Sequence, residues 1–363
     1  MRVVVVTDIP SPYQVELFDA IANLKGWNLK VIYVRRSATE RMWETIPISH
    51  NHCFLVDTVS SEVSSEITAC DLAVFSGYRP AELGRLIILR NRSQKAWAFW
   101  GERPGYRFRG WLGYRYRAWA LRELRSSRAP VWGIGEWAVD GYRSELGEER
   151  CFFNVPYFSN LGPFFAIERR FERDNCRFLF SGSFIRRKGV DLVVAAYCQL
   201  IKEGFNIELH LLGSGPLENT LKRRLWSSFP CKVRLHGFKQ WRDLAPVYAD
   251  ADVLCVPSRY DGWGLVVAEG LAAGMPVIST DSTGAARELI EPRNGWIVPG
   301  GNEAALLSAM RSAATLGIDR RKMMSQYARQ MARRQDIGPG VKRFAQAAEM
   351  TIEAWTRDAG PSV

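Results

Sequence analysis

Short apolar runs alternate with amphipathic helical patterns along this chain. Residues 3–6 are four consecutive valines, which is typical of a strand buried in a parallel sheet. The pattern of residues 15–24 then places Leu17, Phe18 and Ile21 on one face of a helix. Further strands are predicted at residues 29–34, 71–77, 95–100 and 131–134, and further helices at residues 81–89 and 136–146. This alternation predicts an α/β fold, with an open sheet in the first half of the chain.

The periodicity is interrupted over residues 153–165, where prolines, glycine and asparagine occur. We interpret this stretch as an interdomain linker, because a second series of strands and helices begins with a strand at residues 177–180. A chain of 363 residues is too long for one compact core and suits two domains. We therefore predict an N-terminal α/β domain over residues 1–160 and a C-terminal α/β domain over residues 161–340.

The composition indicates in which cellular compartment the protein works and which kinds of protein it does not resemble. No apolar run approaches the roughly 20 residues of a membrane span, and the apolar core of residues 1–8 is too short for a signal peptide. The seven cysteines are odd in number and scattered, without a CxxC pair, which favours a reducing compartment over a disulfide framework or a zinc site. His50 and His52 lack a second pair of ligands, so we interpret them as loop residues and expect no bound metal.

The net charge is strongly positive, +11 with a pI of about 9.4, and predicts an acidic partner such as phosphate, anionic lipid or nucleic acid. Residues 103–128 contain eight arginines against one acid, Glu123, with aromatic residues between them, and a helix is predicted over residues 111–124. Three interpretations are open: contact with an anionic membrane surface or a lipid-linked acceptor, a surface helix whose arginine stems cover the core, and stacking on nucleic acid. We favour the first and expect no nucleic acid.

The motif that most strongly indicates a ligand-binding site lies between residues 256 and 290. A short apolar strand runs into a loop with Asp261 and a Gly-Trp-Gly sequence at residues 262–264, and a helix that begins near Leu265 carries Glu269. The start of a helix attracts an anion, and the glycines allow a ligand to approach the backbone. The two carboxylates can reach different parts of one ligand. A diphosphate with hydroxyl groups for each carboxylate describes a sugar nucleotide; the alternative is an ordinary βα loop with two solvated acids.

This stretch resembles the signature of the retaining glycosyltransferases of family four, the group 1 glycosyl transferases. The shared pattern is a carboxylate, seven residues and a glutamate, with Gly-aromatic-Gly-Leu after the first carboxylate, and the flanking Pro257-Ser258 and residues 274–278 also match. Asp261 departs from the family, which usually has glutamate there. The resemblance implies the GT-B fold, in which two Rossmann-like doubly wound domains face each other across a cleft. It also implies that a terminal helix, here about residues 341–363, crosses back to pack on the first domain.

A basic loop at residues 181–189 is the second feature on the donor side. A glycine-containing loop that ends in basic residues at the start of a helix is typical of a phosphate site. The family shares the Lys-Gly pair that begins here with Lys188, but it usually has an arginine at the position of Ser183. Arg186 or Arg187 is expected to supply that charge, because cations beside a leaving diphosphate offset its developing charge.

The resemblance implies roles for three groups of residues. The expected catalytic residues are Lys188, Arg187, Asp261 and Glu269. The expected donor-binding residues are Gly182, Ser183, Arg186, Gly213, Gly237, Phe238, Gly262, Trp263, Gly264 and Leu265. The acceptor-side candidates are Ser11, Tyr13, Glu102 and Arg103, where relatives often have a Gly-Gly pair and a histidine. The matching motifs cover about residues 176–300, whereas in residues 1–150 the resemblance rests on the strand–helix pattern alone.

These observations predict a retaining glycosyltransferase that moves a sugar from a UDP- or GDP-sugar to a glycan or polyprenol-diphosphate-linked acceptor in bacterial polysaccharide or glycoconjugate assembly. Neither a cofactor nor a metal is expected, and the acceptor would attack from the face that the departing phosphate occupies. The protein is expected in the cytoplasm, peripheral on the inner face of the plasma membrane. Three alternatives are a GT-B sugar-nucleotide epimerase, a phosphorylase, and a non-catalytic partner subunit that binds lipid or nucleic acid through residues 103–128.

Overall fold

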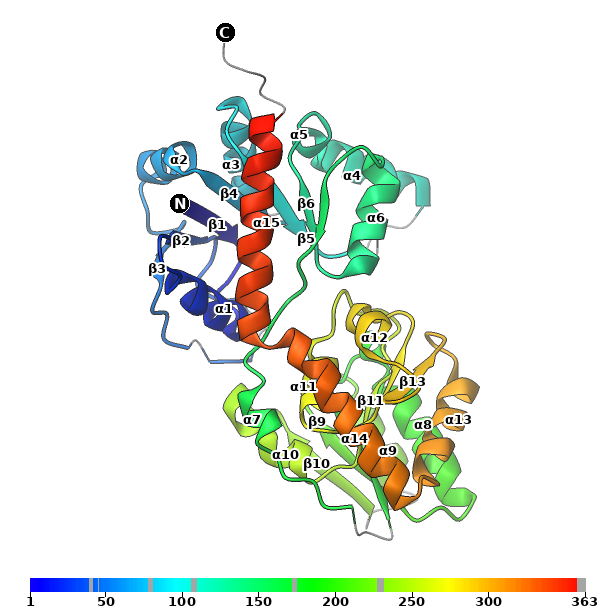
Figure 1. Cartoon of the computed structure of the whole chain (residues 1–363). Helices are drawn as coiled ribbons and strands as arrows, with labels where there is room; N and C mark the ends of the chain where they lie inside the picture. Colours follow the sequence, from blue (N-terminus) through cyan, green and yellow to red (C-terminus); the bar gives the residue numbers. More distant parts are fainter. Residues whose placement is uncertain are drawn as a thin grey trace. The chain divides into compact units, whose positions relative to one another are not determined.

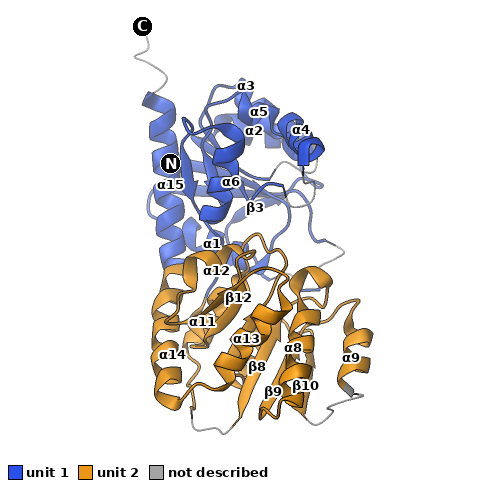
Figure 2. Ribbon diagram, turned by 90° about the vertical axis from the view of Figure 1, so that its right-hand side faces the viewer, with its two compact units in different colours: residues 1–160, 337–363 blue, residues 161–336 orange. Residues whose placement is uncertain are grey.

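The structure is a computed structural model that describes residues 1–38, 42–44, 46–77, 81–105, 110–171, 175–226 and 232–357. The chain divides into two compact units, unit 1 from residues 1–160 and 337–363 and unit 2 from residues 161–336 (Figure 2). Each unit is built on one parallel sheet with helices packed against it (Figure 1). Parts of three predicted features, at residues 78–79, 106–109 and 358–363, lie outside the described residues.

Unit 1 contains a seven-stranded parallel sheet in the order β3-β2-β1-β4-β5-β6-β7. Its strands are β1 (Arg2–Thr7), β2 (Asn28–Tyr33), β3 (Asn51–Phe54), β4 (Leu72–Ser76), β5 (Trp97–Gly101), β6 (Val131–Gly133) and β7 (Phe152–Asn154). Its helices are α1 (Pro12–Ala22), α2 (Ser60–Ala69), α3 (Ala81–Arg92), α4 (Gly110–Ala120), α5 (Arg122–Arg125), α6 (Glu136–Leu146) and α15 (Ile337–Arg357). The valines of β1 are almost completely buried, as expected for a central strand that is covered on both faces.

The last helix, α15, is part of the core of unit 1, although all of unit 2 precedes it in the sequence (Figure 1). The ring of Phe344 lies edge-on to Trp132, with 5.1 Å between centroids. Trp132 Nε1 donates to Thr351 Oγ1 at 3.0 Å, and Trp355 Nε1 donates to the carbonyl of Trp97 at 3.2 Å. These contacts satisfy two buried indole N–H groups, so α15 adds both apolar burial and polar pairing to this unit.

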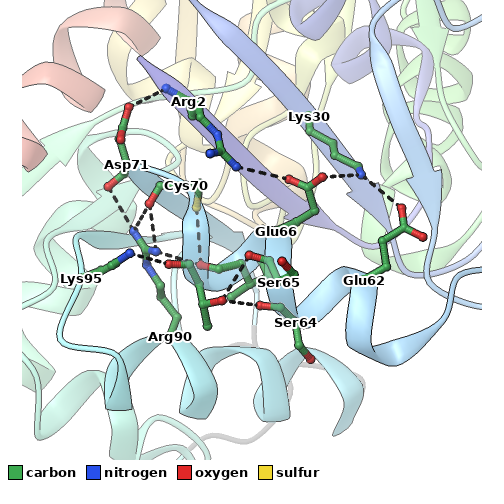
Figure 3. Close-up of polar contacts among 12 residues, drawn as sticks. Arg2, Lys30, Glu62, Ser64, Ser65, Glu66, Cys70, Asp71, Arg90 and Lys95 are labelled. Carbon is green, nitrogen blue, oxygen red and sulfur yellow. Dashed lines mark hydrogen bonds and ion pairs between the residues drawn. The ribbon is translucent and has the colours of Figure 1, made fainter.

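One buried arginine of unit 1 has a structural role. Arg90 of α3 is fully buried and donates to the carbonyls of Ile67, Cys70, Asp71 and Ala96 at 2.7–3.2 Å (Figure 3). These carbonyls lie where α2 ends and where β4 and β5 begin. The guanidinium therefore satisfies carbonyl groups that the end of α2 leaves without a helical partner. All of these hydrogen bonds of Arg90 go to backbone carbonyls at the amino-terminal edge of the sheet.

Unit 2 contains a six-stranded parallel sheet in the order β10-β9-β8-β11-β12-β13. Its strands are β8 (Cys176–Ser181), β9 (Ile207–Leu212), β10 (Val233–Gly237), β11 (Val253–Val256), β12 (Val277–Thr280) and β13 (Gly295–Val298). Its helices are α7 (Gly162–Phe165), α8 (Val190–Lys202), α9 (Glu218–Trp226), α10 (Ala245–Ala249), α11 (Leu265–Ala272), α12 (Gly284–Leu289), α13 (Glu303–Ala314) and α14 (Ile318–Ala332), with short 3₁₀ helices η1 (Arg186–Lys188), η3 (Trp241–Asp243) and η4 (Arg333–Gln335). The predicted α/β class with two doubly wound sheets is confirmed.

Three predicted boundaries are wrong. The Gly-Pro-Gly sequence at residues 338–340 does not precede the last helix but lies in the first turn of α15, where a proline is tolerated because its missing N–H would have no partner. The linker predicted over residues 153–165 contains the end of edge strand β7 and the short helix α7. The helix predicted over residues 111–124 is divided at Leu121, which has φ −102° and ψ 20° and separates α4 from α5.

The interpretation of the two neighbouring histidines as loop residues is right for His50 and wrong for His52. His52 belongs to edge strand β3, and His50 is buried just before it. His50 Nδ1 lies 2.6 Å from Asp19 Oδ1, and its Nε2 lies 3.1 Å from the hydroxyl of Tyr33. Burial lowers the pKa of His50, although the contact with Asp19 opposes this shift. Both ring nitrogens are thus used in packing between α1 and the edge of the sheet.

Within the described ranges, no helix is both long enough and apolar enough to cross a bilayer.

Candidate functional site

The strand order of unit 2 determines where its ligand site can form. The connections run outward in opposite directions from β8 and β11, which are neighbours in the sheet. The loops that follow these two strands, residues 182–189 and 257–264, therefore leave the same edge at the topological switch point. Both predicted donor-side motifs occupy these loops.

The structure brings the two motifs into direct contact. Lys188 Nζ lies 2.5 Å from Asp261 Oδ2, and both side chains are largely buried. Such a charge-assisted hydrogen bond places an ammonium group and a carboxylate at the switch point. Asp261 also adjoins the start of α11, because a Cβ built on Gly264 would lie 3.4 Å from Asp261 Oδ2.

A second set of contacts ties the two loops together. Arg259 forms a bidentate ion pair with Asp191, with both N–O distances at 2.8 Å, and also donates to the carbonyl of Arg186 at 2.6 Å. Arg187 Nη1 donates to the carbonyl of Tyr260 at 2.9 Å. Arg187, predicted to be catalytic, is thus engaged with the backbone of the facing loop. Sequence reasoning did not find Arg259 or Asp191, since neither belongs to a recognised motif.

The loop before α11 is shaped by close backbone contacts. The amide of Asp261 donates to the carbonyl of Ser282 at 2.8 Å, and the amide of residue 285 donates to the carbonyl of Trp263 at 2.8 Å. Gly264 is the N-cap of α11 and has φ +93°, and a Cβ there would lie 2.8 Å from Thr283 Cγ2. Only glycine fits this position without strain. The first N–H groups of α11 are consequently presented at the same edge as Lys188.

Glu269 lies inside α11, is buried, and has a tyrosine partner. The hydroxyl of Tyr248, from α10, donates to Glu269 Oε2 at 2.9 Å. Burial raises the pKa of Glu269 to about 7, and the hydrogen bond from Tyr248 opposes the shift only in part. Tyr248 is itself hydrogen-bonded to Ser181 at the end of β8. The three side chains thus connect the end of β8 with α10 and with the interior of α11.

The remaining residues that were predicted to bind the donor lie at the ends of β8, β9 and β10 or in the loops that follow them. Gly182, Ser183 and Arg186 follow β8, Gly213 follows β9, and Gly237 and Phe238 end and follow β10. Gly213 has a steric reason to be glycine, because a Cβ there would lie 2.0 Å from the carbonyl oxygen of Gly182. Ser183 and Phe238 are exposed, whereas Trp263 is buried. The loops therefore lie close enough for their backbones to form one surface.

Three of the acceptor-side candidates lie along the sheet edge of unit 1. Tyr13 and Glu102 both form hydrogen bonds with the half-buried Tyr157, and these contacts, together with desolvation of its hydroxyl, raise the pKa of Tyr157 well above its usual value. Ser11 is the buried N-cap residue of α1. Arg103 has its guanidinium 4.5 Å from the ring centroid of Trp137, which indicates a packing role.

Within the part of the chain that the structure describes, no three His, Cys, Asp or Glu side chains are grouped so as to hold a metal ion. The cationic groups at the candidate site of unit 2 come from lysine and arginine side chains.

Comparisons with known proteins show what unit 2 and the fold are similar to. Residues 165–331 match the sequence profile of the family described as glycosyl transferases group 1. A GDP-mannose-dependent monoacylated alpha-(1-6)-phosphatidylinositol monomannoside mannosyltransferase of Corynebacterium glutamicum is 34% identical over 208 residues, which cover 53% of this chain and 54% of that protein. A putative colanic acid biosynthesis glycosyltransferase, WcaL of Escherichia coli K12, is 29% identical over 141 residues, which cover 37% of this chain and 34% of WcaL. The matches span 34–54% of the length of these first curated relatives.

Solved structures extend the likeness to almost the whole chain. The crystal structure of Anabaena HepE in complex with UDP has a TM-score of 0.74 at 14% identity, and the match covers 96% of this chain and 100% of that one. At that identity the likeness shows the fold. The profile match thus identifies residues 165–331 with the group 1 glycosyl transferases, glycosyltransferase family four, and the solved structures show that the chain has the GT-B fold.

Proposed function

We propose that this protein transfers a sugar from a UDP- or GDP-sugar to an acceptor, with retention of configuration at the anomeric carbon. The observation that carries the proposal is the meeting of Lys188 and Asp261 at the switch point of unit 2, next to the start of α11. A cation, a helix N-terminus and two carboxylates at one sheet edge suit a diphosphate that links a ribose to a sugar.

Each residue has a proposed role in donor binding. Lys188 would bind the diphosphate oxygens together with the first N–H groups of α11 and a neighbouring arginine, Arg186 or Arg187. Asp261 would hold Lys188 in place and orient the sugar. Glu269 would accept hydrogen bonds from donor hydroxyl groups, most simply those of the ribose, which requires its ionised form. Gly213, Gly237 and Phe238 would border the nucleotide base.

In the proposed reaction the bond between the anomeric carbon and the diphosphate oxygen breaks, and its electron pair stays on that oxygen. The acceptor hydroxyl oxygen forms the new bond on the same face of the sugar, and its proton passes to the departing phosphate. Lys188 and the helix N-terminus stabilise the negative charge as it develops. Positioning of donor and acceptor supplies the remainder of the rate enhancement.

The acceptor we propose is a glycan or a lipid-linked glycan at the cytoplasmic face of a membrane. Two relatives support this class, since their names refer to phosphatidylinositol monomannoside and to colanic acid. Tyr13, Tyr157 and Glu102 are the proposed acceptor-side group in unit 1, because they present hydroxyl and carboxylate groups at the edge where ligands bind in such sheets.

The donor site is tested by thermal unfolding with UDP-, GDP- and ADP-sugars. A donor at about one hundred times its dissociation constant should stabilise the protein by about 2.7 kcal/mol. Glu269→Ala should abolish this effect, whereas Glu203→Ala, which changes an exposed ion pair with Arg311 in the same unit, should retain it. Absence of stabilisation by all three series would contradict the proposal. Release of an altered nucleotide sugar without acceptor would indicate an epimerase instead.

Tyr248→Phe should weaken donor binding in a pH-dependent manner. Without the hydroxyl that donates to Glu269, the pKa of Glu269 should rise further, so the carboxylate is less ionised at pH 7. We expect an affinity about tenfold lower at pH 7 and a smaller difference at pH 9. Titration calorimetry across this pH range measures the effect. Tyr197→Phe is the matched control, because it removes a hydroxyl that donates to the carbonyl of Lys232 elsewhere in unit 2. Identical pH midpoints in wild type and Tyr248→Phe would rule out this coupling.

A further inference from the structure

Helix α4 of unit 1 buries a charged residue and exposes its large apolar side chains. Its buried positions are Gly113 and Arg117, and Arg117 is paired with Glu145 of α6 at 2.6–2.8 Å. Its large apolar side chains point away from the unit instead. Successive residues of an α-helix are about 100° apart, so Trp111 and Trp119 lie on the face opposite Arg117. An ordinary surface helix has the reverse arrangement, with its apolar stripe toward the core.

The outward face is unusually apolar and aromatic. Trp111 is 68% exposed, Leu112 73% and Trp119 64%, and Tyr114, at the border of this face, is 44% exposed. All four lie within the eleven residues of α4. Isolated exposed apolar residues need no explanation, but a cluster of this size on one helix marks an interaction surface.

Each of the two exposed tryptophans has an arginine beside its ring. Arg115 lies 5.2 Å from the ring centroid of Trp111, and Arg122 lies 5.4 Å from that of Trp119. Both arginines are exposed residues. The only acid of residues 110–128, Glu123, is already engaged by Asn91 and Arg122. The local field is therefore positive, and the apolar side chains lie within it.

We propose that the outward face of α4, with the adjoining arginines of α5, docks on an anionic lipid bilayer. Tryptophan and tyrosine partition to the interface between headgroups and acyl chains, and arginine binds anionic headgroups. An eleven-residue helix is far too short to span a bilayer, but it can lie in the interfacial plane. This inference does not depend on the sugar-transfer reaction.

Two other occupants fit the surface less well. A single-stranded nucleic acid is bound by stacking in a positively charged groove, whereas the most exposed large apolar residue of this face is an aliphatic one, Leu112. A protein partner would require no excess of one charge, yet the arginines here have almost no acidic counterparts. A bilayer with anionic lipids matches both the apolar side chains and the charge.

The test is co-sedimentation of the full chain with phosphatidylcholine vesicles, with and without phosphatidylglycerol, at low and high salt. Wild type should bind the anionic vesicles and lose most of this binding at high salt. Arg115→Ala/Arg122→Ala should bind about 20- to 30-fold more weakly, and Trp111→Ala/Trp119→Ala about tenfold more weakly or worse. The controls are Val56→Ala/Val59→Ala, which removes similarly exposed apolar residues of unit 1, and Arg333→Ala/Arg334→Ala, which removes two exposed charges of unit 2.

The outcomes separate the alternatives. Weaker vesicle binding in both α4 double variants, with normal binding in both controls and unchanged thermal unfolding, supports the proposal. Absence of binding to anionic vesicles overturns it, and so does equal loss in the control variants. A single-stranded oligonucleotide is assayed in parallel. If only oligonucleotide binding responds to the α4 substitutions, the surface recognises nucleic acid and the bilayer proposal is wrong.

Discussion

Replacing Lys188 with alanine should lower the rate of sugar transfer by about two to three orders of magnitude, because it removes a preorganised cation from the leaving diphosphate. Lys188 is held 2.5 Å from Asp261 by loops that leave the switch point of unit 2, so its charge is in place before the donor binds. Such an interaction strengthens as charge develops, so the loss should appear mainly in kcat. Steady-state kinetics with the donor identified by thermal unfolding provides the measurement.

In this experiment a loss of folding stability must be distinguished from a loss of catalytic rate. Lys188→Ala leaves Asp261 largely buried without its cation, which destabilises the site. Asp252→Asn is the matched control, since Asp252 pairs with Arg177 at 3.3 Å in the same unit and is also largely buried. It should reduce stability with little effect on kcat. A double-mutant cycle of Lys188→Ala and Asp261→Asn should show strong coupling. Similar kcat values for wild type and Lys188→Ala would contradict the proposed role.

The elements predictable from the sequence are those whose signal is local. The run of valines at the start of β1 and the Gly-Trp-Gly loop before α11 each lie within a few residues, so period and glycine spacing were enough to identify them. Lys188 and Asp261 were found separately, by two motifs. Their contact became predictable only through topology, because both loops follow neighbouring strands of a parallel sheet.

The residues that sequence reasoning missed contact partners that lie far from them in the sequence. Tyr248 lies on the five-residue helix α10, and its hydroxyl reaches Glu269 only because two helices of unit 2 pack together. Nothing in the sequence around Tyr248 distinguishes it from a core tyrosine. Arg259 is similar, because its partner Asp191 lies on the first turn of α8. The division of the predicted helix at Leu121 also depends on tertiary packing, since Leu121 is buried while the residues on both sides of it favour a helix.

Glu269→Gln should make the unliganded protein more stable above pH 7 while abolishing donor binding. The unfolded carboxyl ionises near pH 4.5, whereas burial holds the pKa in the folded protein at about 7. Between these values the unfolded state releases a proton that the folded state retains, so the stability of wild type falls as pH rises and then becomes constant above pH 7. Above pH 7 the ionised Glu269 therefore lowers the free energy of unfolding by about 3 kcal/mol. A neutral glutamine avoids this loss and still offers a carbonyl oxygen to Tyr248.

The variant should therefore be about 2 kcal/mol more stable than wild type at pH 8, after allowance for one amide N–H group without a partner, and no more stable near pH 4.5. Denaturant unfolding at both pH values measures the difference. Glu203→Gln provides a control of opposite sign, because hydrogen bonds from Gln199 and Arg311 lower the pKa of Glu203, so its replacement should bring no stabilisation at pH 8. A gain for Glu269→Gln that is equal at both pH values would refute the linkage. A gain confined to high pH, together with loss of donor-induced stabilisation, would show that unit 2 keeps a destabilising buried acid because the donor requires its charge.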